Sequence, residues 1–306
     1  MDKAELHLHL EGSIEAETLL AIDPSLSRAE IEGNLTCASF AEFMRGYVWV
    51  TKLLRTPSHY ALATRHLLER LAAEGVTYAE ITLSAGVVLW KGQDLAAIYE
   101  AIWRETLRSS VKAFWILDAV RHFGGEPGQR VAEFAVSRRR DGVIAFGIGG
   151  DEARGPAQWF RDVFVYASDG GLRLTCHAGE TMGPESIWAA LEIGAERIGH
   201  GIAAVRDEAL MAVLRERNIP LEICISSNVC MGLVPSVEEH PVRRLYDAGV
   251  PIVLNTDDPA FFKTTLTREY ELAQQVFGMP VEELAANSFR YAFGRYLKAN
   301  LPGCSV

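Results

Sequence analysis

Eight short apolar segments recur along the chain, and stretches with helical periodicity separate each from the next. The expected strands are the segment that begins at Ala4 and residues 76–83, 113–120, 143–147, 172–176, 197–199, 221–225 and 252–255. Runs such as Val250-Pro251-Ile252-Val253-Leu254 suit parallel strands that are buried on both faces. Strict alternation of eight strands with helices predicts an α/β fold, the (β/α)8 or TIM barrel. A doubly wound open sheet is the alternative, but no Gly-x-Gly-x-x-Gly turn follows the first strand.

The segments between the strands have the spacing of amphipathic helices. We expect helices near residues 15–22, 39–49, 58–73, 94–110, 128–140, 156–169, 184–193, 207–217 and 237–248, and two closing helices near 266–301. With 306 residues, of which 49% are hydrophobic, the chain can bury one large core. Because no linker or low-complexity stretch interrupts it, we predict a single domain over residues 1–306.

One expected helix has an unusually bulky apolar face. Phe40, Phe43, Met44 and Tyr47 follow the spacing i, i+3, i+4, i+7, so they line one side of the helix. Such a face can pack against the core. It can equally form a hydrophobic lid, over residues 36–56, above a pocket near the first strand.

Charge and composition exclude several classes of protein. The net charge of −10 argues against nucleic acid as a partner, because phosphate binding needs a basic surface. The N-terminus lacks the pattern of a secretory signal and no apolar run approaches the length of a membrane span, so we expect a cytoplasmic protein that acts on a small molecule. The five cysteines include no Cys-x-x-Cys pair, so we expect neither a disulfide framework nor a thiolate zinc site.

Ionisable residues collect where the expected strands end. His7 and His9 share one face of the first strand, and the fifth strand leads into His177-Ala178-Gly179-Glu180. His200 follows the sixth strand, and Asp257-Asp258 follow the eighth. The C-terminal ends of barrel strands meet at one mouth, where active sites are built. Three histidines and a carboxylate there suit a catalytic Zn²⁺ with an open coordination position, whereas a lone His-x-His pair is as easily explained by core packing.

Five motifs resemble, in the same order, the signature set of the adenosine deaminase family. They are His7-Leu8-His9-Leu10-Glu11-Gly12-Ser13, His177-Ala178-Gly179-Glu180, Arg197-Ile198-Gly199-His200-Gly201, Ser226-Ser227-Asn228 and Asn255-Thr256-Asp257-Asp258-Pro259. The resemblance spans nearly the whole chain. It implies a barrel of the metal-dependent hydrolase type that holds one Zn²⁺ and hydrolyses the exocyclic 6-amino group of a purine, releasing ammonia.

The resemblance also implies roles for single residues. Glu180 matches the carboxyl that protonates purine N1, and His200 matches the imidazole that orients the attacking hydroxide and steadies the charge on the adduct. Asp258 matches the side chain that bonds purine N7, and Gly150 the glycine whose amide meets N3. The residues that match the zinc ligands are His7, His9, His177 and Asp257.

Elementary chemistry supports the central roles. Attack on an aromatic C6 breaks the conjugation of the ring, so a proton donor at N1 must neutralise the developing charge. Glu180 can be that donor if burial and neighbouring carboxylates raise its pKa. Asp257 can accept the proton of the attacking water. Asp258 also has a purely structural interpretation, because an Asp before Pro259 is a common helix N-cap.

The identity of the substrate stays open. In adenosine-specific members of the family an Asp commonly meets the ribose 5′ hydroxyl at the place where this chain has Glu11. Adenosine and 6-aminodeoxyfutalosine, a menaquinone-pathway nucleoside with a bulky aromatic carboxylate in place of that hydroxyl, are therefore equal candidates. The residues expected to border the substrate are Gly150, Asp258, His9, Glu11, Phe40, Phe43 and Met44.

Three other functions are alternatives to nucleoside deamination. Free adenine is an alternative substrate. A non-catalytic nucleoside-binding protein would need an incomplete site, yet all the catalytic residue types are present. An amidohydrolase for amides or phosphoesters would usually need a bridging lysine and a second metal, and no lysine lies near a strand end between the third and fifth strands. The sequence does not predict an oligomeric state.

Overall fold

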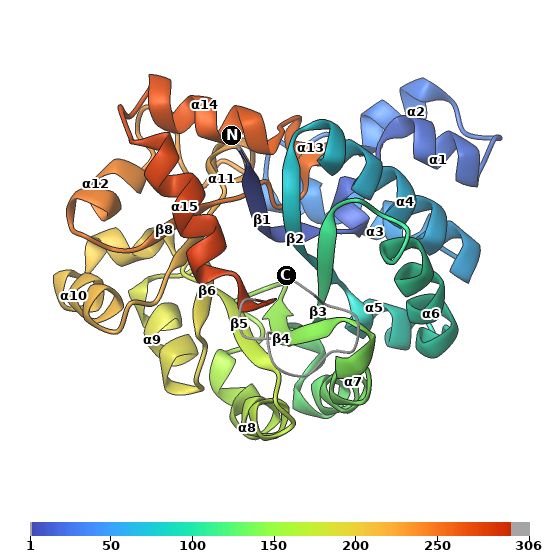
Figure 1. Ribbon diagram of the computed structural model, residues 1–306, viewed down its shortest axis with the longest axis horizontal. Coiled ribbons are helices and arrows are strands. Elements are labelled where there is room, and N and C mark those ends of the chain that lie inside the picture. Colours follow the sequence, from blue (N-terminus) through green and yellow to red (C-terminus); the bar gives the residue numbers. More distant parts are fainter. Residues whose placement is uncertain (1, 295–306) are drawn as a thin grey trace.

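A ring of parallel strands forms the centre of the computed structural model, which describes residues 2–294. The strands pair in chain order, from β1 with β2 through to β7 with β8, and Figure 1 shows the helices arranged around them. This order confirms the predicted (β/α)8 barrel. The strands are β1 (Lys3–His9), β2 (Val76–Leu83), β3 (Lys112–Val120), β4 (Val143–Gly149), β5 (Arg173–Ala178), β6 (Arg197–His200), β7 (Leu221–Ile223) and β8 (Ile252–Leu254).

The ring closes between β8 and β1 just beyond the end of β8. The amide of His9 donates to the carbonyl of Asp257 at 2.9 Å, and the amide of Asp257 donates to the carbonyl of His7 at 3.0 Å. One side chain adds to this seam, because Asn255 Oδ1 accepts a hydrogen bond from the amide of Leu6 at 2.9 Å. Closure of the barrel therefore places Asp257 between the two histidines of β1.

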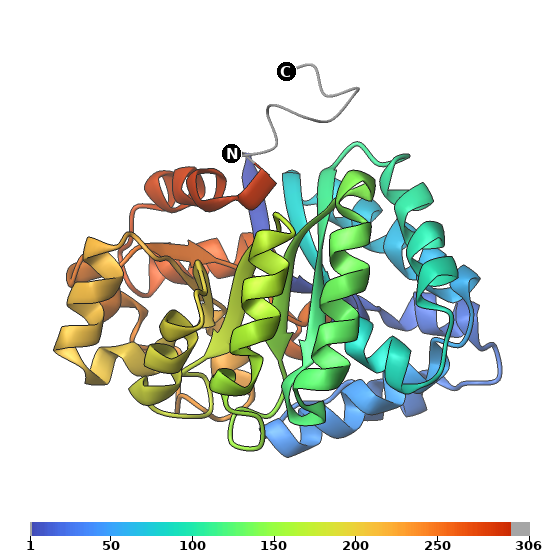
Figure 2. The same ribbon diagram turned by 90° about the horizontal axis from the view of Figure 1, so that it is seen from below.

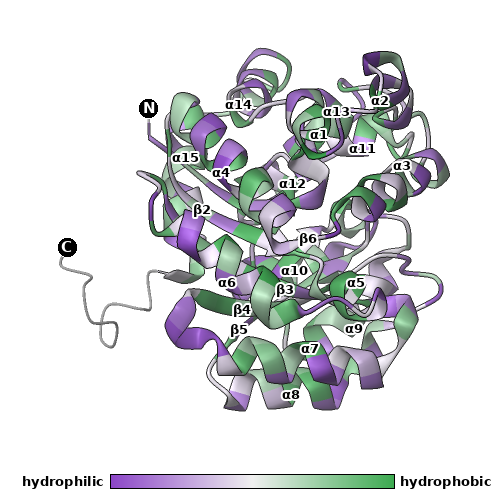
Figure 3. Ribbon diagram, turned by 90° about the vertical axis from the view of Figure 1, so that its right-hand side faces the viewer, coloured by the Kyte–Doolittle hydropathy of each residue, from purple (hydrophilic) through white to green (hydrophobic). Residues whose placement is uncertain are grey.

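Amphipathic helices cover the outside of the barrel, and Figure 3 shows hydrophilic and hydrophobic residues alternating along them. α15 packs against β1 and β8. The α-helices in residues 2–294 are α1 (Ala16–Ile22), α2 (Arg28–Asn34), α3 (Phe40–Leu53), α4 (Pro57–Ala73), α5 (Ala85–Trp90), α6 (Leu95–Thr106), α7 (Gly125–Ser137), α8 (Arg161–Asp169), α9 (Pro184–Glu192), α10 (Glu208–Glu216), α11 (Ile225–Cys230), α12 (Val242–Asp247), α13 (Pro259–Phe262), α14 (Leu266–Gln275) and α15 (Val281–Tyr291).

Some helix predictions were wrong in their extent. The helix expected over 237–248 begins only at Val242, because Pro241 cannot continue a helix from the residues before it. The helix expected over 156–169 is divided into a 3₁₀ turn, Ala157–Phe160, and α8. Three short helices, α5, α11 and α13, follow β2, β7 and β8 directly and were not predicted. They are too short to show a helical period in the sequence.

The helix expected to carry the apolar face is α3. Figure 2 shows it lying across the end of the barrel that is opposite the N-terminus. The ring of Phe43 packs against Phe261 and Phe262 of α13, with ring centres 5.2 and 5.4 Å away. Gly46 allows the close approach to α2, because a Cβ there would lie 2.2 Å from the carbonyl oxygen of Asn34. α3 thus packs against its neighbours on one side, while Phe40, Phe43, Met44 and Tyr47 line a cavity.

The closing helices predicted near 266–301 correspond to α14 and α15, and the part of that segment from residue 295 lies outside the described residues, as does Cys304. The other four cysteines, Cys37, Cys176, Cys224 and Cys230, form no disulfide. Within residues 2–294, no helix combines the length and the apolar character needed to cross a membrane.

Candidate active site

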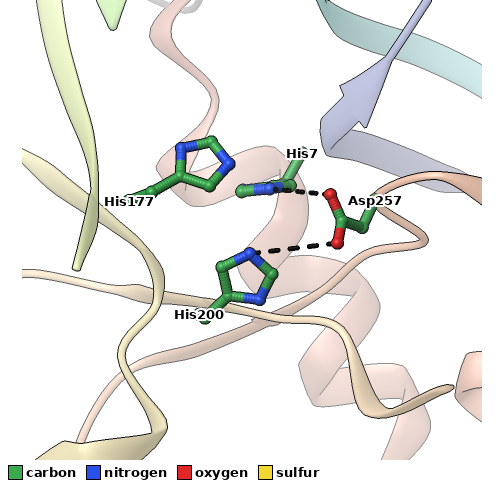
Figure 4. Close-up of side chains that lie close together, drawn as sticks. All are labelled: His7, His177, His200 and Asp257. Atoms are coloured by element: carbon green, nitrogen blue, oxygen red, sulfur yellow. Dashed lines mark ion pairs between the residues drawn. The ribbon is translucent and has the colours of Figure 1, made fainter. Parts of the chain in front are cut away.

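The barrel brings the predicted ligand residues to one point at its mouth. His9 Nε2 lies 3.2 Å from His177 Nε2, and Asp257 Oδ1 lies 3.3 Å from His9 Nε2 and 3.4 Å from His7 Nε2. Figure 4 shows His7, His177, His200 and Asp257 facing one another from separate parts of the chain. Residues far apart in sequence thus converge at the ends of β1, β5, β6 and β8.

This donor set fits a metal ion. In a tetrahedral site with ligand bonds of about 2.0–2.1 Å, neighbouring ligand atoms are about 3.3–3.4 Å apart, which matches the separations found here. His7 Nε2 is buried and has no hydrogen-bond partner in the described part of the chain, as expected for an atom that points at an ion. Two groupings can hold an ion: one contains His7, His177, His200 and Asp257, and the other contains His9, Asp257 and Asp258.

A buried acid fixes the orientation of His7. Glu222 Oε2 lies 2.7 Å from His7 Nδ1, so that nitrogen carries a proton and Nε2 is turned towards the cluster. Arg197 holds the other oxygen of Glu222 at 2.5 Å and also pairs with Glu80 at 2.5 Å. Sequence reasoning missed Glu222. The available signal was its charge inside the apolar strand Leu221-Glu222-Ile223, because a buried charge requires a partner.

Two residues of α11 support the opposite side of the site. Ser227 Oγ donates to Asp257 Oδ2 at 2.7 Å, and Asn228 Nδ2 lies 3.3 Å from His200 Nδ1. His240 in turn lies 3.1 Å from Asn228 Oδ1. Ser227 thus helps to orient Asp257, and Asn228 helps to orient His200. Ser226 instead bonds Thr264 and Glu269, away from the site.

Burial sets the ionisation of the histidines. It lowers the pKa of His9 to about 4 and that of His200 to about 3, so both are neutral at pH 7. Burial also opposes charge on His7, but the neighbouring carboxylates of Asp257 and Glu222 outweigh it and raise the pKa of His7 to about 10. These two carboxylates therefore favour positive charge at this point, which is what a cation site requires.

The backbone is strained at two of these positions. His200 has φ of 60° and Asp257 has φ of 64°, a region that favours glycine. Such strain persists where the surrounding structure enforces it, and it is common at functional sites. Gly199 makes room for His7, because a Cβ at that position would lie 2.8 Å from His7 Cε1.

Glu180 lies beside this cluster, and its side chain is 8% exposed. Its Oε1 is 3.5 Å from His200 Nε2. Burial, with the nearby charges of Asp257 and Glu152, raises the pKa of Glu180 well above its usual value. Glu152 also holds the loop after Glu180, since its Oε2 accepts from the amide of Met182 at 2.8 Å. A raised pKa favours the protonated carboxyl, which is the form that can act as an acid.

Asp258 takes the N-cap position of α13, but its side chain makes no capping hydrogen bond. Its Oδ1 is buried without a partner in the described part of the chain. Gly12 provides the space, because a Cβ there would lie 1.5 Å from that oxygen. The capping interpretation thus accounts for the position of Asp258 in the chain and leaves its side chain available to another partner.

A cavity of about 290 Å³ opens above the cluster, at the small end of ligand-binding pockets. The expected residues that line it are His9, Phe40, Phe43, Met44, Gly150, His177, Glu180, His200, Asp257 and Asp258. Glu11 does not line it. Its carboxylate is 1% exposed and lies behind Tyr47 and Ser84, and burial raises its pKa to about 7.

The cavity also includes residues that sequence reasoning did not select. Asp118, at the end of β3, is buried, and burial raises its pKa to about 8. Trp90 of α5 is 69% exposed and stacks on Phe123, with ring centres 5.8 Å apart. Asp118 had the same signal as Glu222, a charge inside an apolar strand. Other residues of the cavity lining lie on loops and short helices, whose positions cannot be predicted from the sequence pattern. They include Ser84, Val87, Lys91, His122 and Met231.

Comparison with known proteins agrees with this geometry. Residues 2–297 match the sequence profile of the family described as adenosine deaminase. The chain belongs to the adenosine deaminase family. It is 37% identical over 296 residues to the adenine deaminase of Rhizobium leguminosarum bv. trifolii, covering 94% of this chain and 92% of that protein. It is 36% identical over 312 residues to the aminodeoxyfutalosine deaminase of Streptomyces avermitilis, covering 96% and 87%.

Among solved structures, an amidohydrolase of Burkholderia ambifaria with bound Zn resembles this chain with a TM-score of 0.86 and 25% identity, covering 98% of this chain and 89% of that one. The protein is therefore an adenosine deaminase-family enzyme, a hydrolytic deaminase. The metal expected for the family has a fitting set of side chains in His7, His9, His177, His200 and Asp257.

Proposed function

We propose that this enzyme is a zinc-dependent deaminase that hydrolyses the 6-amino group of an adenine nucleoside to give the 6-oxopurine and ammonia. The observation that carries the proposal is the convergence of four side chains beside a buried Glu180 and at the base of a cavity: His9 lies 3.2 Å from His177, and Asp257 lies 3.3 Å from His9 and 3.4 Å from His7. When bound there, zinc lowers the pKa of a coordinated water towards neutrality, which supplies a nucleophile at pH 7.

The surrounding side chains have separate tasks in this proposal. Glu180 donates a proton to purine N1 as C6 is attacked, which prevents charge from building up on the ring. His200, neutral and held by Asn228, orients the attacking oxygen, and Asp257 accepts its proton. Asp258, protonated or sharing a proton, bonds N7, and the amide of Gly150 meets N3. The raised pKa of Asp258, caused by burial and the neighbouring Asp257, supports a side chain that donates.

The outer wall of the cavity favours a nucleoside as substrate. Beyond the catalytic groups the cavity continues past Val87 to Trp90 and Phe123. The exposed Lys52 of α3 also lines it. An aromatic pair with a nearby cation suits an aryl carboxylate, the group that 6-aminodeoxyfutalosine carries at the 5′ position. Similarity to an aminodeoxyfutalosine deaminase supports the same substrate, and adenosine is the smaller nucleoside that the site can accept.

Adenine is the second candidate, because the chain is equally similar to an adenine deaminase and the cavity is small. The deciding experiment is a substrate profile with purified protein, measuring ammonia release from 6-aminodeoxyfutalosine, adenosine and adenine. We expect a nucleoside to have the highest kcat/KM. A preference for adenine of roughly 100-fold would overturn the nucleoside assignment, and no turnover of any of the three would overturn the proposed reaction.

Treatment with a chelator provides the control for the metal. Activity should disappear when the metal is removed and return when zinc is added. Full activity in protein that metal analysis shows to contain no zinc after chelation would contradict the zinc assignment.

A further inference from the structure

Three residues near the cavity form a short chain of hydrogen bonds. Glu11 Oε1 accepts from the amide of Ser84 at 3.1 Å, and Glu11 Oε2 accepts from the hydroxyl of Tyr47 at 3.4 Å. The hydroxyls of Tyr47 and Ser84 lie 2.7 Å apart. Tyr47 and Ser84 line the cavity, and Glu11 lies behind them with an exposed fraction of 1%.

The carboxylate sets the direction of this chain. Glu11 accepts at both carboxylate oxygens, so the single hydroxyl proton of Tyr47 is donated to it. The hydroxyl proton of Ser84 is then donated to Tyr47, and the lone pairs of Ser84 Oγ are left for a ligand. The cavity wall therefore presents an acceptor here, and its natural partner is a donor such as a sugar hydroxyl.

The order of the strands indicates which part of the substrate reaches this wall, and this step rests on the proposed function. With Glu180 of the β5 end at N1, Gly150 after β4 at N3 and Asp258 after β8 at N7, the ring orientation is defined. N9 lies on the purine edge between N7 and N3. The barrel order places β1, β2 and β3 between β8 and β4, so a group on N9 extends towards the ends of those strands.

Ser84 follows directly after β2, and Tyr47 reaches the same place from α3. We propose that Tyr47 and Ser84 form the site that accepts a hydrogen bond from a ribose hydroxyl, and that Glu11 positions them from behind without touching the substrate. Tyr47 and Ser84 thus determine the preference for a nucleoside over a free base, while Glu11 acts through them. The lid helix α3 contributes a specific polar contact in addition to apolar surface.

The test compares adenosine with adenine as substrates of three variants. Tyr47→Phe and Ser84→Ala should each lower kcat/KM for adenosine about 5- to 20-fold, the loss expected for one hydrogen bond to a well-ordered partner. The same variants should change kcat/KM for adenine less than about twofold, because adenine has no ribose to lose contact with. Glu11→Gln should follow the pattern of Tyr47→Phe, since its amide can donate to Tyr47 and reverse the chain.

Tyr60→Phe is the matched control. Tyr60 is buried in α4, and its hydroxyl makes a 3.4 Å hydrogen bond to Gln93 outside the cavity lining. It should leave both substrates unaffected. Equal losses on adenosine and adenine, or no loss for adenosine in Tyr47→Phe and Ser84→Ala, would overturn the inference. A loss in Glu11→Gln with none in Tyr47→Phe would also overturn it, because Glu11 would then meet the substrate directly.

A binding measurement tests this inference separately from the proposed reaction. The dissociation constants of purine riboside and of purine, neither of which has a 6-amino group, can be measured calorimetrically in the same variants. Weaker binding of purine riboside alone in Tyr47→Phe supports the inference even if the wild type deaminates no nucleoside. Unchanged binding of purine riboside overturns the inference even if the wild type is active.

Discussion

The cavity has two halves that are held in different ways. The inner half consists of side chains at strand ends, and polar groups behind them fix their positions: Glu222 holds His7, Ser227 holds Asp257 and Asn228 holds His200. The outer half comes from α3, α5 and the turn after β3, and it relies on packing between apolar groups such as Trp90 and Phe123. In the proposed function, the reaction type therefore depends on the inner half and the choice of substrate depends on the outer half.

The largest effect is expected at Glu180, because the proposed reaction needs it to donate a proton to the purine ring. Glu180→Gln should lower kcat about 100- to 10,000-fold while leaving the affinity for a purine product within a few fold. Wild-type turnover should fall as pH rises through the raised pKa of Glu180, because the deprotonated carboxylate cannot donate. That alkaline decline should be absent from the residual activity of the variant.

Glu185→Gln is the control for Glu180→Gln, since Glu185 is exposed and its carboxylate bonds the amide of Gly183. It should be as active as the wild type. If Glu180→Gln retained full turnover, the role of Glu180 as acid would be wrong even in an active enzyme.

A smaller effect is expected behind the inner half, at Glu222. Glu222→Gln weakens the hydrogen bond that orients His7, so zinc affinity should fall about 10- to 100-fold in a competition assay with a chromophoric chelator. Glu80→Gln is the matched variant, because Glu80 pairs with the same Arg197 and does not contact His7. It should lower the melting temperature without changing zinc affinity. Equal zinc affinities in the two variants would show that Glu222 does not contribute to zinc binding.

The smallest effect is expected in the outer half. Trp90→Ala removes the exposed ring that stacks on Phe123, so kcat/KM for 6-aminodeoxyfutalosine should fall about 2- to 10-fold. Adenine turnover should stay the same, because the base does not extend that far. A uniform loss on both substrates would mean that the outer wall also supports the inner half.

The inner half could be predicted from sequence, because strand ends in a barrel share one mouth and the ionisable residues follow directly after the expected strands. Glu222 could not be placed in the same way. Which charge inside a strand faces His7 depends on the register that aligns His177 with Gly199 and Gly199 with Glu222, and no local pattern encodes that alignment. Its charge in an apolar strand indicated that a partner existed but not which one.

The outer half was harder to predict, because short helices and loops form it. Resemblance to the family placed Glu11 at the substrate, whereas in the structure its carboxylate lies behind Tyr47 and Ser84. Tyr47 of α3 reaches Ser84 at the end of β2 and covers Glu11. This contact depends on how α3 crosses the barrel. The apolar face of α3 did not reveal the polar contact made by Tyr47.

The position of the metal tests the central claim most directly. In an anomalous difference map recorded at the zinc absorption edge, we predict one peak within about 2.0–2.2 Å of His7 Nε2, His9 Nε2, His177 Nε2 and the carboxylate of Asp257. His200 should stand back from the ion and stay bonded to Asn228. A peak that is ligated by His200 in place of His9, or an active enzyme with no metal at these residues, would contradict the account.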